Sequence, residues 1–254
     1  MLATAAQIAS RTSAVSELLV HEFDSDMRRV AVPRPEIHLV ARFVPATQSG
    51  LDVSALVVRE QAHRKFIRSG QRIVMARLQL GAHLAVLGVP ACALAGRIVA
   101  LEDLWGEPAA RRLCDRLAAS SGTRQAAAIL EHAIAERVAG ARVHSQHTRL
   151  ALASTAMLAN ASVSSVASEL GVSARHLRRV FRETLGVSPK TFAKLTRFQR
   201  ALRASRANQH VNWANIAAAS GYYDQAHLIA EFRTLTGVTP QILLQELRAQ
   251  AFDS

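Results

Sequence analysis

Apolar residues recur at two different spacings along the chain. Three stretches, 37–44, 53–59 and 73–80, alternate apolar and polar positions, which is the period of a half-buried β-strand. From residue 108 onwards, apolar positions recur every three or four residues, which predicts helices over 108–120 and 123–139 and along the whole C-terminal part. The pattern therefore predicts an α+β protein: a β-rich N-terminal domain with trailing helices, followed by an all-α C-terminal domain.

A repeat of about fifty residues organises the C-terminal part. The first copy runs from Val166 to Pro189 and the second from Ile216 to Pro240. Both carry Gly, His-Leu, Phe-Arg and Gly-Val-Ser/Thr-Pro at matching positions. Two copies of one such period are typical of a tandem pair of supersecondary units.

Each copy reads as two helices separated by a tight turn, which is the helix-turn-helix geometry. Ser173 and Asp224 stand at the N-cap of the second helix in each copy, and Gly171 and Gly221 stand where the first helix ends. Ser-Pro after the first copy starts a long helix over 190–204 that joins the two units. The side chains expected to face the core are Val163, Val166, Ala167, Leu170, Leu177, Val180, Phe181, Leu185, Phe192, Leu195, Leu202, Trp213, Ile216, Ala217, Leu228, Phe232 and Leu235.

Residues 163–240 resemble the DNA-binding domain of AraC/XylS-type transcriptional regulators. The family signature Gly-Phe-x-Asp-x-x-His-Leu-x-x-x-Phe-Arg-x-x-x-Gly-x-Thr-Pro stands here as Gly221 to Pro240, with Tyr222 in place of Phe. The resemblance implies a double helix-turn-helix DNA-binding domain over 146–250. It also implies an effector-sensing or dimerisation domain over 1–143, and residues 140–146 are the best linker candidate.

The charge supports this interpretation. The chain has a formal net charge of +12. Between Arg175 and Arg206, ten basic residues stand with a single acid, Glu183. A solvated helix face usually mixes both signs, whereas an unmixed basic stretch repels itself and favours a polyanion such as DNA.

The second helix of each unit, 173–185 and 224–236, is expected to enter the major groove. The resemblance aligns Arg175, Arg178 and Arg179 with base-reading positions, although a phosphate contact is the alternative for any single arginine. The second unit presents Gln225, Ala226, Ile229 and Ala230, and Ala230 stands where many family members carry a basic residue. We therefore expect strong sequence reading by the first unit and weak reading by the second. The complete predicted DNA-contacting set is Arg175, Arg178, Arg179, Arg182, Lys190, Gln225, Ala226, Ile229 and Arg233.

Two histidines, His176 and His227, occupy equivalent slots of the two copies. Equivalent placement favours a shared structural role, such as a buried hydrogen bond at the start of a helix, over catalysis.

The N-terminal domain is expected to be a small β-rich domain, such as the jelly-roll half common in the family, and it has no cupin metal motif. The helices over 107–139 carry apolar faces that pack on this domain or form the seam of a homodimer. Those apolar residues are Leu113, Leu117, Ile129, Leu130, Ile134 and Val138.

Catalytic and metal chemistry have weak candidates. Glu60 with His63, and Glu36 with His38, could form a metal or acid/base pair, but surface salt bridges explain both more simply. The two cysteines, Cys92 and Cys114, have no metal-ligand spacing. We therefore expect no catalytic residue, metal site or cofactor.

Membrane insertion and secretion are not expected either. The charge-free windows 78–96 and 150–168 are too polar to be membrane spans, and no basic leader precedes an apolar stretch. We therefore expect a cytoplasmic protein.

Three functions remain to be weighed. The first is a sequence-specific transcription regulator, with double-stranded DNA, RNA polymerase and a small-molecule effector as partners. The second is an architectural DNA-binding protein of low specificity. The third is an enzyme fused to a DNA-binding module, such as a repair alkyltransferase, which needs a reactive cysteine that neither Cys92 nor Cys114 resembles.

Overall fold

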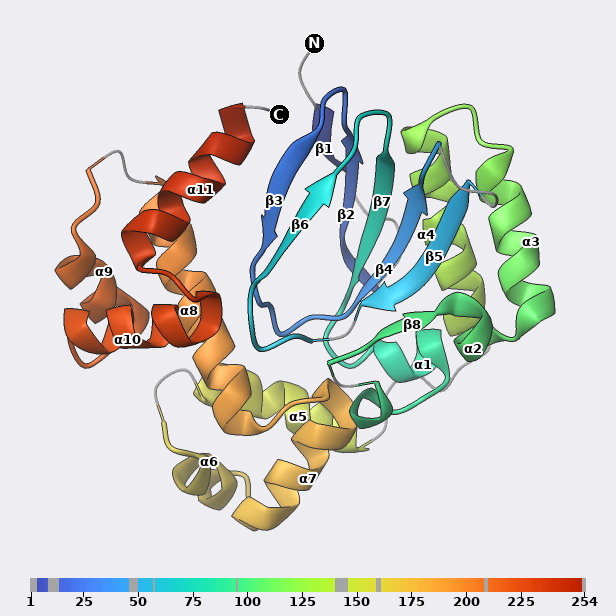
Figure 1. The fold of residues 1–254 in the computed structure, drawn as a ribbon. Helices are drawn as coiled ribbons and strands as arrows, with labels where there is room; N and C mark the ends of the chain where they lie inside the picture. The colour runs from blue at the N-terminus through green and yellow to red at the C-terminus, as the bar shows by residue number, and fades with distance from the viewer. Residues whose placement is uncertain are drawn as a thin grey trace.

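The computed structural model describes residues 4–8, 14–45, 50–56, 58–94, 96–139, 146–158, 161–207 and 210–252. The described strands all lie within residues 4–100, and the described elements after residue 100 are helices, which confirms the predicted α+β class (Figure 1). The strands are β1 (Thr4–Ile8), β2 (Val15–Glu22), β3 (Met27–Ala31), β4 (His38–Phe43), β5 (Leu51–Leu56), β6 (His63–Ile67), β7 (Arg72–Leu78) and β8 (Ile98–Ala100). The helices are α1 (His83–Leu87), η1 (Ala91–Ala93), α2 (Leu101–Trp105), α3 (Glu107–Ala118), α4 (Thr123–Ala139), α5 (Gln146–Met157), α6 (Val163–Glu169), α7 (Ala174–Leu185), α8 (Pro189–Ala207), α9 (Trp213–Ser220), α10 (Gln225–Thr236) and α11 (Pro240–Phe252).

The described strands form two antiparallel sheets. One has six strands in the order β1-β2-β7-β4-β5-β8, and the other consists of β3 and β6. The three predicted strands correspond to β4, β5 and β7, the three neighbours at the centre of the larger sheet. A regular jelly roll divides eight strands between two comparable sheets, so the described strands depart from that expectation.

Different layers cover the two faces of the larger sheet. On one face lie α3 and α4, whose buried side chains include Leu113, Leu117, Leu130 and Ile134. On the other face lies the β3–β6 sheet, with an apolar cluster between the sheets made of Phe23, Met27, Val40, Ile67 and Ile73.

The apolar faces of residues 107–139 were expected either to pack on the N-terminal domain or to form the seam of a homodimer. They pack on the sheet of their own chain, with Ile129 and Val138 partly buried beside the four fully buried residues. A dimer through this region would have to use the outer surfaces of α3 and α4.

The two helix-turn-helix units form as the local signals predict. Ser173 Oγ accepts a hydrogen bond from His176 N at 3.1 Å, and Asp224 Oδ1 accepts one from His227 N at 2.7 Å. Gly171 and Gly221 adopt φ values of 67° and 86°, the left-handed region in which glycine ends a helix at little cost. The joining helix α8 begins at Pro189 and ends at Ala207, three residues beyond the predicted end.

The predicted core is also largely as expected. Most of the predicted residues are buried, and Val163, Leu170 and Trp213 are partly buried against them. Among the aromatic residues, Phe181 contacts Phe192 edge-on at 5.7 Å between ring centroids, and Phe198 lies 4.7 Å from Phe232.

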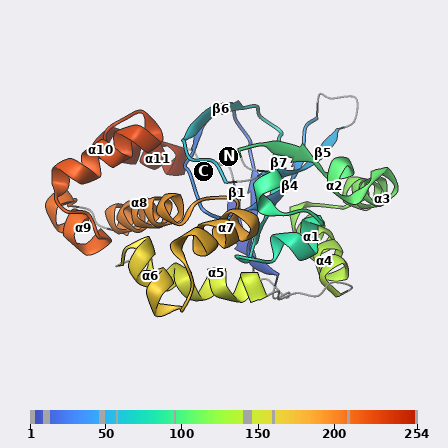
Figure 2. The ribbon, with the colours of Figure 1, turned by 90° about the horizontal axis from the view of Figure 1, so that it is seen from below.

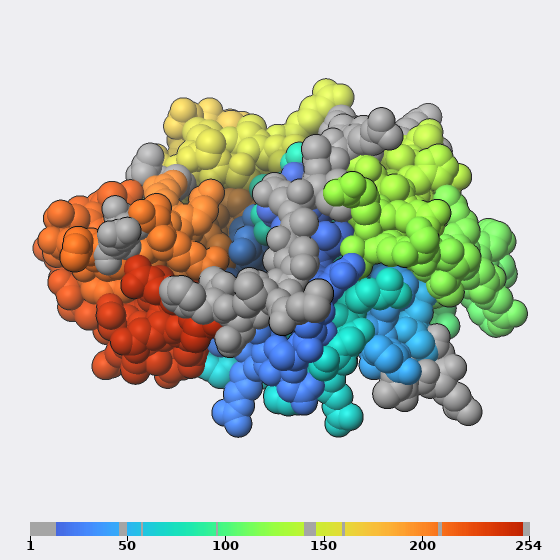
Figure 3. Space-filling model, turned by 90° about the horizontal axis from the view of Figure 1, so that it is seen from above, coloured from blue at the N-terminus to red at the C-terminus, as the bar shows by residue number. Residues whose placement is uncertain are grey.

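The two halves of the chain are in direct contact (Figures 2 and 3). Gln199 Nε2 of α8 donates a hydrogen bond to Pro33 O at 2.6 Å. Ala62 N donates to Leu235 O at 2.7 Å, and Arg64 forms an ion pair with Glu246 of α11 at 2.9 Å. Buried apolar residues of both halves belong to one continuous cluster. The boundary at 143/146 stays a prediction, and linker residues 140–145 lie outside the described part.

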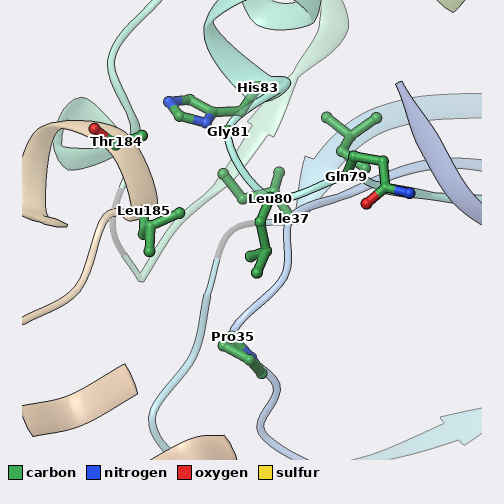
Figure 4. A pocket seen from close by; sticks show the side chains of 9 residues that line it. Pro35, Ile37, Gln79, Leu80, Gly81, His83, Thr184 and Leu185 are labelled. Carbon is green, nitrogen blue, oxygen red and sulfur yellow. The ribbon is translucent and has the colours of Figure 1, made fainter. Parts of the chain in front are cut away.

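A second contact joins the end of α7 to the N-terminal half. Thr184 and Leu185 face Ile37, Leu80 and His83 across a cavity of about 10 Å³ (Figure 4). That volume holds no more than one water molecule, so the contact is a packed seam and not a ligand site. Beside it, a Cβ on Gly186 would lie 3.1 Å from Ala91 O.

Buried histidines make the fold sensitive to acid. Burial lowers the pKa of His21 to about 4, the pKa of His38 to about 3 and the pKa of His83 to about 4. The charges of Arg29 and then Lys65 lower the pKa of His21 further. The charges of Arg77 and then Arg34 do the same for His38. At His83 a hydrogen bond with the Glu183 backbone opposes the shift. Because these folded-state pKa values lie below 6.5, the unfolded chain takes up protons first, and stability is lost as the pH falls from about 6.5 towards 4.

We expect the free energy of unfolding to fall by about 2 kcal/mol for each of these histidines between pH 7 and pH 5. Urea unfolding of the full chain at the two pH values measures this loss. His83→Gln should reduce the pH dependence. Equal curves for wild type at both pH values would contradict the prediction.

Candidate nucleic-acid interface

Helix α7 separates its apolar and basic residues onto opposite faces. Leu177, Val180, Phe181 and Leu185 are buried against the core. All four predicted arginines of this helix, Arg175, Arg178, Arg179 and Arg182, are exposed. The local sequence thus places four guanidinium groups together on one solvent-facing surface.

These four arginines have no carboxylate within ion-pair distance in the described part of the chain. The one acid of the helix, Glu183, faces His147 of α5 instead, with its Oε2 3.4 Å from His147 Nδ1. Arg179 Nη2 lies 3.1 Å from His176 Nδ1, a hydrogen bond that steadies the side chain at the start of the helix. Guanidinium groups without carboxylate partners are available to phosphates and to guanine edges.

Helix α10 presents a different surface. Gln225, Ala226 and Arg233 are exposed, but Ile229 is half-buried and packs against the core. The predicted DNA contact of Ile229 is therefore available only to the exposed part of its side chain.

Tyr223, which the sequence analysis did not single out, is 93 % exposed directly before the N-cap of α10. An exposed aromatic ring at the start of a recognition helix is a further candidate contact. The neighbouring Tyr222 is buried, so the sequence alone does not indicate which ring of the pair faces solvent.

The basic stretch is divided between surface and interior. Lys190 is exposed at the first turn of α8. Lys194, in contrast, lies 3.5 Å from Glu60, and Arg197 Nη2 lies 2.5 Å from Glu231 Oε2 of α10. Arg206 turns towards the N-terminal half, where its charge acts on Arg29. Lys194 and Arg197 are therefore not expected to contact DNA.

The pair Arg197–Glu231 fixes α10 on α8. Arg197 also lies 4.9 Å from the ring centroid of Tyr222. Its pKa is lowered by burial, but the hydrogen bond and charge of Glu231 outweigh this and raise it overall. A cation held in this way positions the second recognition helix and leaves no free charge for DNA.

The buried hydrogen bond expected as an example of a shared structural role for the two histidines is not formed. His176 is half-buried and His227 is exposed, so neither ring makes a buried hydrogen bond. Their contacts also differ: His176 meets Arg179 and His147, whereas His227 Nδ1 accepts a hydrogen bond from Tyr223 N at 3.4 Å. The N-cap bonds at these positions come from the backbone amides and not from the rings.

The salt bridges expected for the Glu-His pairs are also absent from the described residues. Glu60 pairs with Lys194, and His63 is exposed on β6. His38 is buried, and its Nε2 has no hydrogen-bond partner, because the ring faces the interior between the two sheets.

Metal-ligand residues do not gather in the described ranges, where no group of three or more His, Cys, Asp or Glu side chains could hold an ion. Cys92 is exposed and Cys114 is half-buried on α3, where burial raises the pKa of its thiol. Within the same ranges, every helix is too short or too polar to cross a membrane.

A helix-turn-helix domain family matches residues 166–246. Among solved structures, the chain is similar to a DNA-binding transcriptional dual regulator from Escherichia coli K-12, with 24% identity, a TM-score of 0.35 and coverage of 43% of this chain and 98% of that chain. The C-terminal domain of AraT, a response regulator from Geobacillus stearothermophilus, gives 22% identity and a TM-score of 0.37 over 41% of this chain and 88% of that chain. ToxT from Vibrio cholerae O395 gives 9% identity and a TM-score of 0.45, with coverage of 91% of this chain and 97% of that chain. The comparison with curated proteins gave no significant match.

Proposed function

We propose that this protein is a sequence-specific, DNA-binding transcription regulator of the AraC type, since residues 166–246 match a helix-turn-helix domain family and carry the AraC-like signature Gly221 to Pro240. The observation that carries the proposal is the surface of α7, where four exposed arginines have no carboxylate partner in the described residues. Helices 173–185 and 224–236 would read adjacent segments of the major groove, the first more strongly than the second.

The direct test is a competition assay. Operator DNA from upstream of the protein's own gene should bind about 10³-fold or more tightly than random DNA at fixed salt. A ratio near one would contradict this proposal and favour the architectural DNA-binding protein, in which charge dominates and sequence has little effect.

The two units should protect two major-groove segments about 34 Å, or ten base pairs, apart on one face of the DNA. Footprinting on the same operator measures this spacing. Protection of a single segment would mean that α10 does not engage DNA.

The remaining parts of the proposal concern the N-terminal half. It would modulate DNA binding in response to a small-molecule effector and would pair with a second copy through the outer surfaces of α3 and α4. Contact with RNA polymerase, and action in the cytoplasm, complete the proposed role of a regulator bound near a promoter. Sedimentation of the full chain, with and without operator DNA, tests the homodimer.

A further inference from the structure

Two cations face each other across the smaller sheet. Arg29 of β3 and Lys65 of β6 are direct cross-strand partners in the antiparallel pair. Met27 and Ile67, two positions away on the same face, are buried between the sheets. Because side chains alternate along a strand, Arg29 and Lys65 point in the same direction, towards the larger sheet. Like charges placed directly opposite each other destabilise a strand pair.

Arg206 acts electrostatically on Arg29 and on Arg34, and we call Arg29, Arg34, Lys65 and Arg206 together the inner cation cluster. Arg206 lies on the last turn of α8, on the face that carries Gln199 against Pro33. Burial and then the charge of Arg206 lower the pKa of Arg29. Burial and then Arg77, with a smaller contribution from Arg206, lower the pKa of Arg34. The cluster therefore spans both halves of the chain.

The protein's own carboxylates leave most of this cluster uncompensated. Arg42 and Arg77, at its edges, have their own partners, Asp52 and Glu17, each at 2.5 Å. Arg34 is near Glu36 and Glu17, whose charges oppose part of the lowering of its pKa.

Arg29, Lys65 and Arg206 form no ion pair among the described residues; Arg29 lies over the ring of Phe23, 5.3 Å from its centroid. Outside the described residues, the sequence contains one acid, Asp253. The cost of keeping three cations together is therefore not offset within the described chain.

The neighbouring groups show that this region is electrostatically unfavourable in the free protein. Lys65, half-buried on β6, has its pKa lowered to about 8 by burial, with further contributions from Arg42, Arg29 and Arg59. His21 of β2 stays neutral beside them. Deeper on the same side of the larger sheet, His38 Nε2 and Arg77 Nε are buried without hydrogen-bond partners. Natural proteins tolerate such local violations of favourable packing where a ligand offsets them.

We propose that the inner cation cluster binds an oxyanion with two negative charges, a dicarboxylate or a phosphate, as the effector of this regulator. Three cations without carboxylates match two negative charges better than one, and guanidinium groups bind such oxyanions through paired hydrogen bonds. Arg206 is exposed in the last turn of α8, so the cluster reaches solvent there.

The bound anion would connect strands β3 and β6 to α8, the helix that joins the two DNA-binding units. Its identification as an effector rests on the proposed function, whereas its binding does not, and the two are tested separately.

The binding test uses the full chain in chloride buffer at fixed ionic strength, with inorganic phosphate, succinate or acetate added. Phosphate or succinate should raise the Tm of wild type by a few degrees, and acetate should raise it much less.

Lys65→Met and Arg29→Met should abolish this rise in Tm. Lys65→Met should also be more stable than wild type at pH 7 without the anion, because it relieves the repulsion. Arg28→Met is the matched control, since Arg28 is the exposed neighbour of Arg29 on the same strand, and it should respond like wild type.

Equal rises in Tm with acetate, phosphate and succinate would overturn the proposal that the ligand carries two negative charges. If Arg28→Met loses the rise in Tm as completely as Arg29→Met does, the proposed site is wrong. The site is also wrong if the Tm of wild type does not rise with either dianion.

The effector role is tested by measuring operator affinity with and without the dianion, where we expect at least about a fivefold change that Lys65→Met abolishes. Unchanged affinity with an intact Tm response would overturn the effector role alone. If operator and random DNA bind equally well while the dianion still raises the Tm, the proposed function is wrong and the anion site is still supported.

Discussion

Replacing Arg179 by alanine should weaken operator binding about 10- to 100-fold. Arg179 is exposed on α7 and is held by His176, so its guanidinium meets DNA with little further loss of side-chain entropy. A bidentate contact of arginine with guanine contributes about 1–3 kcal/mol of discrimination, and each 1.4 kcal/mol corresponds to a tenfold change in affinity. Titration of labelled operator with the purified full chain, at one salt concentration, measures the loss.

The same titration with Gln225→Ala should show less than about a threefold loss, since a neutral side chain on α10 contributes no phosphate attraction. Arg68→Ala removes the same charge from the exposed segment between β6 and β7 and controls for the overall charge of the protein. A loss confined to the operator, with unchanged binding to random DNA, identifies base reading; a loss on both DNAs identifies a phosphate contact. Equal operator losses for Arg179→Ala and Gln225→Ala would disprove the asymmetry between the units.

Replacing Phe232 by alanine should lower the free energy of unfolding by about 3–5 kcal/mol. The side chain is fully buried at the centre of the second unit, between Phe198 of α8 and Trp213 of α9. Its truncation removes both ring contacts and leaves a cavity that three helices cannot close together. Urea denaturation of the full chain, followed by circular dichroism and by Trp213 fluorescence, measures the loss.

Ile242→Ala is the control for this variant. Ile242 lies 45 % exposed on α11, so its truncation should cost less than about 1 kcal/mol. The Phe232→Ala variant should also lose the second protected segment in a footprint while keeping the first, because α7 has its own core around Phe181 and Phe192. Equal destabilisation by both variants would show that Phe232 is not the centre of that core.

The helical half of the protein could be predicted because its signals are local. A hydroxyl or carboxylate at an N-cap, a glycine at the end of a helix and apolar residues every three or four positions act within one or two turns. For this reason Ser173, Asp224 and Gly221 could be assigned correctly without tertiary information.

The missed strands lack such signals. Two of the five residues of β3, Arg28 and Arg29, are charged, and β6 contains Arg64 and Lys65 in addition to His63. Their alternation becomes visible only once the two strands pair over an apolar layer. The same limit applies to Lys194 and Arg197, whose partners Glu60 and Glu231 are remote in sequence, so charge density alone overstated the surface available to DNA.

The contact between residues 62–64 and α10 has a consequence for protein engineering. The last carbonyl groups of a helix have no partners within it. Here Leu235 O accepts a hydrogen bond from Ala62 N, and Thr236 O accepts one from Arg64 Nη1 at 3.0 Å. The N-terminal half therefore completes the end of α10 in the other half. A chimera that grafts a foreign sensor onto this C-terminal half must supply equivalent donors, and transplanting residues 60–64 with their strand is the simplest way to do so.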